Sequence, residues 1–163
     1  MSQELPSIRR ATPSEFARLR EIEVESDAIF ASVGIGPFCY DDAVYLERAA
    51  VVLVAGEPPV GFVSVDVVDG AAHIWQLSVL ASAQGRGLGR ALVAAACDWA
   101  RSEGCAAVTL TTFRDVPWNA PFYEKLGFRA LNQLTAGLEA IRRHELEIGD
   151  DGFGPRIAMR REL

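Results

Sequence analysis

The sequence predicts a mixed α/β fold, in which a twisted and mostly antiparallel sheet of about six to seven strands is flanked by helices. Three strand-like runs follow one another between Ala50 and Leu80 with only tight turns between them, as in an antiparallel meander. From Gly87 the apolar residues change to helical spacing, and another strand-like run follows. This strand–helix–strand passage predicts a right-handed crossover to a parallel neighbour. The 163 residues contain no linker or repeat, so we expect a single domain over 3–163.

The first third of the chain is expected to hold one strand and two helices. Ile8–Ala11 is typical of a short strand, and Thr12 with Glu15 forms a capping box that starts a helix. The segment Gly34–Pro37 ends that helix, and Asp41–Ala49 is predicted to form a second, shorter one. The apolar positions at helical spacing in the first helix are Phe16, Leu19, Ile22 and Ile29.

Tight turns divide the rest of the chain. Asp69-Gly70 is a strong signal for a two-residue hairpin, and Gly104 is a typical helix C-cap. The predicted strands are Ala50–Ala55, Val60–Val68, Ala71–Leu80, Ala106–Thr112, Phe128–Leu134 and Arg156–Arg161. The predicted helices run from Gly87 to Gly104, over Pro121–Leu126 and over Ala136–Ile148.

Composition limits the possible partners. The net charge of −6 argues against a nucleic-acid surface, which is normally basic. No apolar run is long enough to cross a membrane, and the N-terminus lacks a secretion signal, so we expect a cytoplasmic protein that does not bind membranes. Cys39, Cys97 and Cys105 form no CxxC pair and have no histidine cluster nearby, which favours reduced, buried cysteines and no metal site.

The segment from Gln84 to Arg90, QGRGLGR, is a candidate anion site. It joins a strand to a helix, whose first turn carries free backbone N–H groups and partial positive charge. Its glycines allow the backbone to approach a ligand closely, and a pyrophosphate fits such a place. The segment lacks the Walker A pattern and the GxGxxG dinucleotide fingerprint, which disfavours a nucleotide-dependent oxidoreductase.

The segment does match the pattern [Gln/Arg]-x-x-Gly-x-[Gly/Ala] through Gln84, Gly87 and Gly89. The strand before it carries Leu77-Ser78-Val79, and Tyr123-Glu124-Lys125-Leu126-Gly127-Phe128 follows after a helix and a strand. With these three pieces in order, the chain resembles the GCN5-related N-acetyltransferase (GNAT) superfamily. The resemblance implies a GNAT-like fold, acetyl-CoA as the cosubstrate and no metal.

The resemblance also implies coenzyme-binding residues. Backbone groups of Leu77, Ser78 and Val79 are expected to bind the pantetheine arm, and the Val79 amide to meet the oxyanion. The pyrophosphate is expected on Gln84, Gly85, Arg86, Gly87, Leu88, Gly89 and Arg90. Asn119 and Phe122 are further expected contacts, although Asn119 is equally placed to cap the next helix. Arg86, Arg90 and Arg114 are candidates for the ribose phosphate.

For the chemistry, Tyr123 is the candidate acid that protonates the coenzyme A thiolate, with packing against Phe128 as the alternative. The strand before the glycine turn lacks the carboxylate that many relatives use as a base. His73 is the candidate base there, and Glu21, Glu25 or a water relay are alternatives.

The acceptor is expected to be a small-molecule or peptide amine. Acidic residues on the first two helices could attract it, or they could simply form a solvated face: Glu21, Glu23, Glu25, Asp27, Asp41 and Asp42. Phe30, Phe38, Tyr40 and Trp75 are candidates for an apolar pocket or for the core. A non-catalytic acyl-CoA sensor on the same fold is the alternative function, and a homodimer is compatible with the sequence.

Overall fold

The Asp69–Gly70 turn forms the hairpin at the centre of the sheet. In the computed structural model, which describes residues 3–38, 40 and 44–163, both turn residues have positive φ, 52° and 77°. A type I′ turn requires this geometry, and its twist matches that of the strands it joins. β3 (Gly61–Val68) and β4 (Ala71–Val79) therefore pair antiparallel, as the sequence predicts.

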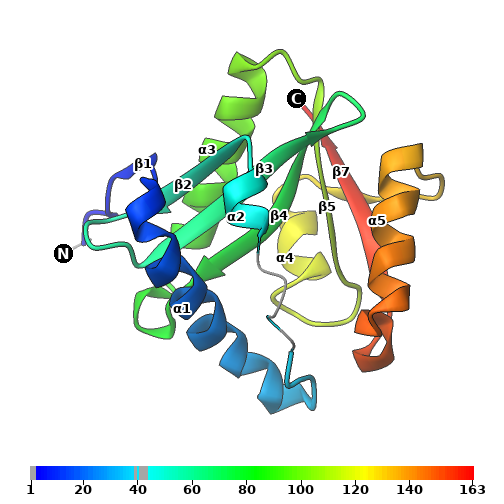
Figure 1. Cartoon of the computed structure of the whole chain (residues 1–163), viewed down its shortest axis with the longest axis horizontal. Coiled ribbons are helices and arrows are strands. Elements are labelled where there is room, and N and C mark those ends of the chain that lie inside the picture. The colour runs from blue at the N-terminus through cyan, green and yellow to red at the C-terminus, as the bar shows by residue number, and fades with distance from the viewer. Residues whose placement is uncertain (1–2, 39, 41–43) are drawn as a thin grey trace.

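Within the described residues, seven strands form one sheet in the order β1-β2-β3-β4-β5-β7-β6 (Figure 1). Only β4 and β5 are parallel neighbours, and α3 (Leu88–Ser102) connects them, so the predicted crossover and the mixed, mostly antiparallel sheet are confirmed. The other strands are β1 (Ile8–Arg10), β2 (Val51–Ala55), β5 (Ala107–Phe113), β6 (Arg129–Ala130) and β7 (Arg156–Glu162).

Helices cover both faces of the sheet (Figure 1). On one face, α1 (Phe16–Asp27) and α2 (Tyr45–Arg48) pack on Val54 and Phe62 through a small apolar cluster. On the other, α3 and α4 (Ala120–Lys125) pack on the larger core cluster. α5 (Ala136–Glu147) lies beside β7, with Thr135 as its N-cap.

The first helix spans the predicted range but is less regular than predicted. Short 3-10 segments, Pro13–Glu15 and Ala28–Val33, precede and follow α1, and Gly34 ends the second with φ 74°. The Glu15 carboxylate accepts a hydrogen bond from the Thr12 backbone N–H at 2.9 Å, which is the expected capping contact. The predicted helix Asp41–Ala49 is confirmed in its second half, where α2 forms, and its first residues, Asp41 and Asp42 among them, lie outside the described residues.

The predicted strand Phe128–Leu134 is wrong in length, because only Arg129 and Ala130 pair with β7. After one more bond, from the Leu131 N–H to the Ala158 carbonyl, the chain turns away to start α5. Cys97 is buried, Cys105 is partly buried, and Cys39 lies outside the described residues.

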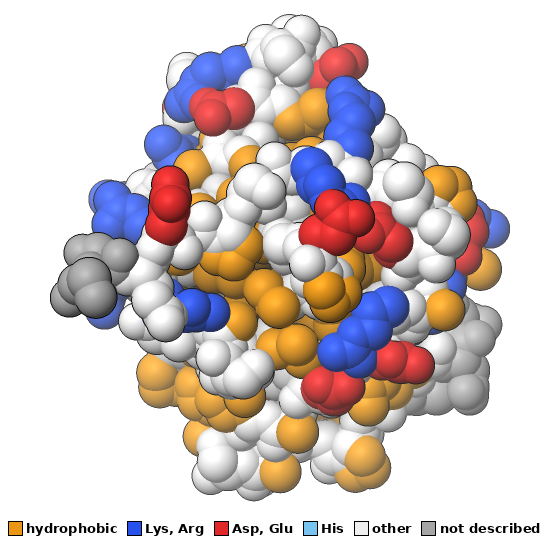
Figure 2. Space-filling view, turned by 90° about the vertical axis from the view of Figure 1, so that its left-hand side faces the viewer, with side chains coloured by type: hydrophobic (Ala, Val, Ile, Leu, Met, Phe, Trp, Pro, Cys, Tyr) orange, Lys and Arg blue, Asp and Glu red, His pale blue; other side chains and the backbone are white. Residues whose placement is uncertain are grey.

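Charges of both signs are mixed on the surface. On the face that carries the β1 edge, Lys and Arg side chains lie next to Asp and Glu side chains around a hydrophobic area (Figure 2). Among the described residues, no helix combines the length and apolarity that a membrane crossing requires. The same residues contain no group of three or more His, Cys, Asp and Glu side chains arranged to hold a metal ion.

Candidate active site

The site begins where β4 and β5 part. Their ladder has three residue pairs and ends at Ile74 with Leu110. The next residue, Trp75, is an extra residue in β4, because Ile74 faces Val65 while Gln76 faces the preceding residue of β3, Ser64. Such a β-bulge bends the strand and increases its twist. Beyond this point the two parallel strands diverge.

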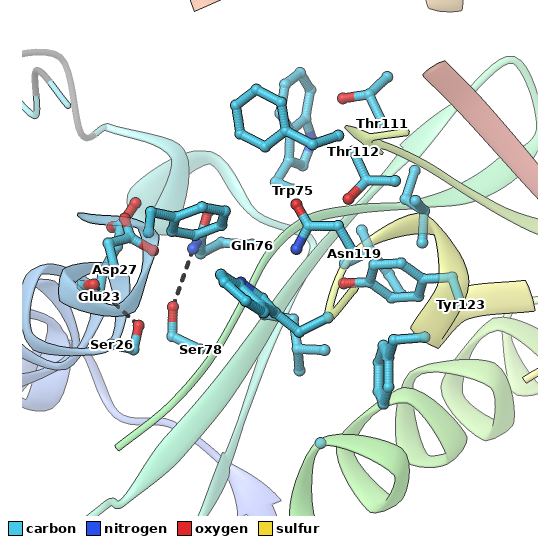
Figure 3. Close-up of a pocket in the computed structure, with 18 of the residues that line it drawn as sticks. Glu23, Ser26, Asp27, Trp75, Gln76, Ser78, Thr111, Thr112, Asn119 and Tyr123 are labelled. Atoms are coloured by element: carbon cyan, nitrogen blue, oxygen red, sulfur yellow. Dashed lines mark hydrogen bonds between the residues drawn. The ribbon is translucent and has the colours of Figure 1, made fainter. Parts of the chain in front are cut away.

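A cavity of about 920 Å³ fills the space between the diverging strands. Side chains from both faces of the sheet line it, so it passes through the sheet (Figure 3). Glu23 and Asp27 from α1 and Glu145 from α5 lie on one face. Leu88 from α3 and Tyr123 from α4 lie on the other. Molecules that enter from opposite faces can therefore meet between β4 and β5.

The β4 backbone supplies hydrogen-bonding groups to this cavity. The Leu80 N–H donates to the Val60 carbonyl at 2.9 Å. Since bonded and non-bonded pairs alternate in an antiparallel ladder, Val79 opposite Gly61 is a non-bonded pair. The backbone groups of Val79, and of Leu77 two residues earlier, therefore point away from β3 and into the gap. The Ser78 side chain is buried and accepts a bond from the Gln76 amide at 3.0 Å.

The glycine turn connects β4 to α3 at the cavity mouth. Gly85 and Gly87 have φ of 78° and 84°, a backbone conformation that favours glycine. Gly87 is the N-cap of α3, and its carbonyl accepts the hydrogen bond of the Ala91 N–H. The backbone N–H groups between these two residues, in the first turn of the helix, therefore remain available. The turn residues that line the cavity are Gln84, Gly85, Gly87, Leu88, Gly89 and Arg90.

The three candidate arginines occupy different places. Arg90 is exposed at the cavity wall and forms no ion pair among the described residues. Arg86 lies off the cavity, where its guanidinium donates to the Gln3 side chain at 2.8 Å. Arg114 pairs with its neighbour Asp115 at 3.0 Å. This leaves Arg90 as the one of the three that faces the cavity.

Tyr123 reaches the cavity from α4. Its side chain is 8% exposed, it packs edge-to-face between Phe122 and Phe128, and its hydroxyl has no hydrogen-bond partner among the described residues. Burial raises the pKa of Tyr123, so the phenol stays protonated at neutral pH. Thr112, 5% exposed, also lines the cavity and forms no side-chain hydrogen bond within the described part of the chain. Figure 3 shows both side chains near Asn119.

The Asn119 side chain faces the cavity. Asn119 is the N-cap of α4 by position, but its side chain makes no capping hydrogen bond. Phe122, the other coenzyme contact expected in this helix, also lines the cavity. Together with Tyr123, α4 therefore brings three of the predicted residues to one wall.

His73 is less suited to act as a base. It is 1% exposed, and its Nδ1 lies 2.8 Å from the Thr109 hydroxyl. Burial lowers its pKa to about 4, with a smaller opposing effect from Glu145. The ring is therefore neutral at pH 7 and takes up a proton only in acid.

The acidic residues of α1 divide into two groups. Glu21 and Glu25 are exposed and both pair with Arg18, at 3.0 and 3.1 Å. Glu23 and Asp27 line the cavity instead, although Glu21-x-Glu23-x-Glu25 is typical of a solvated face. Glu23 is buried, so for this residue the solvated-face alternative is wrong.

A buried ion network on the α5 side was missed by sequence reasoning. The Glu145 carboxylate accepts from Arg156 at 2.5 Å, from Arg142 at 2.9 Å and from the Thr111 hydroxyl at 2.6 Å. Arg142 also pairs with Asp151 at 2.6 Å. These residues come from α5, β5, β7 and the segment between α5 and β7, and apart from the helical spacing of Arg142 and Glu145 no spacing in the sequence indicates that they meet.

Aromatic side chains complete the wall between α1 and β5. Phe30 packs edge-to-face on Phe38 and Trp118, with ring centroids 5.3 and 5.4 Å apart, and lies 5.8 Å from Phe113. All four rings line the cavity, as does Trp75. The prediction left open whether Phe30, Phe38 and Trp75 form pocket or core, and the cavity wall is where they lie.

Solved structures of acetyltransferases share this fold. The PaiA N-acetyltransferase of Thermoplasma acidophilum, solved with coenzyme A, is 16% identical, with a TM-score of 0.69 over 99% of this chain and 100% of that one. The N-acetylglutamate synthase of Neisseria gonorrhoeae, solved with coenzyme A and N-acetyl-glutamate, is 19% identical. Its TM-score is also 0.69, over 99% of this chain and 36% of that one.

A curated protein matches in sequence over a shorter stretch. The glucosamine 6-phosphate N-acetyltransferase of Trypanosoma brucei brucei is 47% identical over 58 residues, which span 36% of this chain and only 37% of that protein. The sequence model of the acetyltransferase (GNAT) family matches residues 16–128, more than half of the chain. With the parted strands, the glycine turn and this match together, the chain belongs to the acetyltransferase (GNAT) family.

Proposed function

We propose that the protein transfers an acetyl group from acetyl-CoA to a primary amine, which attacks the thioester directly. The observation that carries this proposal is the cavity that passes through the sheet between β4 and β5. Acetyl-CoA enters on the α3 and α4 face and the amine on the α1 and α5 face, so the two reactants meet without a covalent enzyme intermediate.

The donor binds along β4 and the glycine turn. The backbone N–H and carbonyl of Leu77, which point into the gap, pair with the amides of the pantetheine arm, as an added strand would. The pyrophosphate lies on the N-terminus of α3, where helix N–H groups and the helix dipole favour an anion. Arg90 adds positive charge at the cavity wall.

Two groups act on the reacting thioester. The Val79 N–H points into the gap and stabilises the oxyanion that forms on the carbonyl oxygen. Tyr123 then gives its phenolic proton to the departing coenzyme A thiolate. Burial keeps that proton in place before the reaction, and a thiolate in the same buried environment is a stronger base than one in water.

The test combines binding and turnover. Calorimetry with coenzyme A checks the donor site, and thiol release from acetyl-CoA with a panel of amines checks the transfer. Tyr123→Phe keeps the ring packing, so we expect unchanged coenzyme A affinity with kcat lowered by about 10²- to 10⁴-fold. An unchanged kcat in this variant refutes the acid role. Tight coenzyme A binding with no turnover on any amine identifies the protein as a sensor instead.

A further inference from the structure

The α1 wall of the cavity carries carboxylates that lie across from Tyr123. Figure 3 shows Glu23, Ser26 and Asp27 on one side of the cavity and Thr112 and Tyr123 on the other, with Gln76 and Ser78 on the strand between them. The carboxylates lie on the face that the acceptor enters, and the tyrosine lies on the donor face. The reacting atoms therefore meet between these two walls.

Within the described part of the chain, tyrosine hydroxyls rather than ion pairs hold these carboxylates. Tyr45 donates a hydrogen bond to Glu23 at 2.5 Å, and Tyr40 donates one to Asp27 at 2.8 Å. Neither carboxylate forms an ion pair among the described residues, although Arg20 lies close enough to lower the pKa of Glu23 slightly. The contrast is with the other buried glutamate of the cavity, Glu145, which two arginines neutralise.

Burial of the Glu23 and Asp27 carboxylates makes a positive charge between them favourable. Burial, with a smaller contribution from the nearby Asp27, raises the pKa of Glu23 to about 7 against the opposing effects of Tyr45 and Arg20. Burial likewise raises the pKa of Asp27 to about 6, against the hydrogen bond from Tyr40. A cation placed between the two carboxylates favours their ionised forms and relieves this penalty.

Independent features of the same cavity indicate the rest of the ligand. The hydroxyls of Thr112 and Tyr123 are aimed into it from more than nine-tenths buried side chains, without hydrogen-bond partners in the described structure. Both hydroxyl oxygens remain accessible from the cavity, so they are available to hydrogen-bond a molecule bound between the two walls. Next to the carboxylates, the rings of Phe30, Phe38 and Trp118 offer an apolar surface that suits an aromatic or aliphatic body.

We propose that the acceptor is a primary amine on an aromatic or apolar body, bound as its ammonium ion between Glu23 and Asp27, with Glu23 taking its proton. This inference rests on the proposed acetyl transfer. It disfavours phosphorylated amino sugars, because Arg156, the one arginine or lysine among the described residues that lines the acceptor face of the cavity, already pairs with Glu145.

The proton balance is complete with the groups present. Glu23 takes one proton from the ammonium ion and releases it to solvent. The neutral amine attacks the thioester carbon, and the carbon–sulfur bond breaks as the new carbon–nitrogen bond forms. Tyr123 protonates the thiolate, and the second proton leaving the nitrogen restores the phenol. The products are the N-acetylated amine, free coenzyme A and one released proton.

The experiment compares phenethylamine with glucosamine 6-phosphate as acceptors for the full-length protein, with thiol release as the readout. We expect turnover of phenethylamine and none of glucosamine 6-phosphate. In Glu23→Gln, kcat/KM for phenethylamine falls by about 10²-fold or more, and the rise of kcat/KM with pH near 7 disappears. Asp27→Asn raises KM more than it lowers kcat.

Glu25→Gln is the matched control, because it removes a carboxylate of the same helix that lies outside the cavity and pairs with Arg18. Its kinetics are expected to match the wild type. Coenzyme A affinity, measured by calorimetry, is expected to be equal in all variants, which separates loss of the acceptor site from misfolding.

The outcomes distinguish the two proposals. Turnover of glucosamine 6-phosphate, or phenethylamine kinetics that Glu23→Gln leaves unchanged, overturns the acceptor site and leaves the acetyl transfer standing. Coenzyme A binding without turnover of phenethylamine, glucosamine 6-phosphate or any other amine overturns both.

Discussion

The Gln84 side-chain amide donates a hydrogen bond to the Val79 backbone carbonyl, 2.9 Å away. This bond joins the last residue of β4 to the start of the glycine turn. It occupies the one backbone acceptor of Val79 that points into the gap and leaves the Val79 N–H available there. The glutamine of the motif therefore fixes the turn relative to the strand, and the glycines that follow are free to face a ligand.

Gly89 offers a clean test of that turn. Its backbone is helical, and a Cβ added to it has its nearest heavy atom, in the Phe122 ring, 3.6 Å away, which is ordinary van der Waals contact. Gly89→Ala is therefore expected to fold normally. If the turn holds the pyrophosphate, the added methyl group meets the ligand, and the coenzyme A Kd rises by about tenfold or more, measured by calorimetry.

Gly152→Ala is the control, because that glycine also lies outside the left-handed region, has open space around it and is distant from the turn. Gly87 is a poorer choice, since its φ of 84° means that any side chain strains the backbone. A coenzyme A Kd that is the same in Gly89→Ala, Gly152→Ala and the wild type contradicts the placement of the pyrophosphate.

Local patterns account for what could be predicted from the sequence. Asp69-Gly70 predicts its hairpin because a type I′ turn needs two residues that tolerate positive φ, and both have it. The strand, glycine turn and helix from Leu77 onwards are likewise set by neighbouring residues. The predicted strand Phe128–Leu134 is too long, because the sequence of one strand alone does not reveal where its partner, β7, ends the pairing.

Long-range contacts explain what could not be predicted. The spacing of Glu21, Glu23 and Glu25 is compatible with a fully exposed helix, and only the packing of α1 and α2 on the sheet turns Glu23 inward. The extra residue at Trp75 has no sequence signature, yet it helps to open the site. Glu145 on α5 pairs with Arg156 on β7, and the sequence does not specify how these two elements lie relative to each other.

The Glu145 network is expected to stabilise the acceptor wall. In Glu145→Gln the side chain keeps its shape but loses its charge, which leaves Arg156 without an ionic partner in a place where its side chain is only 15% exposed. Removing one partner of a buried ion pair destabilises a protein by about 3–5 kcal/mol. We expect a clear loss of unfolding free energy in urea titrations; a change within 0.5 kcal/mol, as is usual for surface substitutions, contradicts the network's role.

The pH dependence of stability provides a measurement on Glu23 that needs no substrate. Its pKa is raised from 4.5 to about 7, so the folded state holds this proton more tightly than the unfolded state. The stabilising contribution is complete below pH 4.5 and is lost as the pH rises through about 7. His73 acts in the opposite direction. Its pKa falls from 6.5 to about 4, so its contribution is lost as the pH falls from 6.5 towards 4.

Because these two effects overlap, the informative quantity is the difference between Glu23→Gln and the wild type. The glutamine cannot ionise but can still accept the Tyr45 hydrogen bond. We therefore expect the variant to gain unfolding free energy relative to the wild type between pH 4.5 and 7, by up to about 1.4 kcal/mol for each unit of pKa shift. Urea titrations at several pH values measure this, with Glu25→Gln as the control. A difference that stays constant with pH means that Glu23 ionises as freely in the folded protein as in water, and its carboxylate then has no burial penalty for an ammonium ion to relieve.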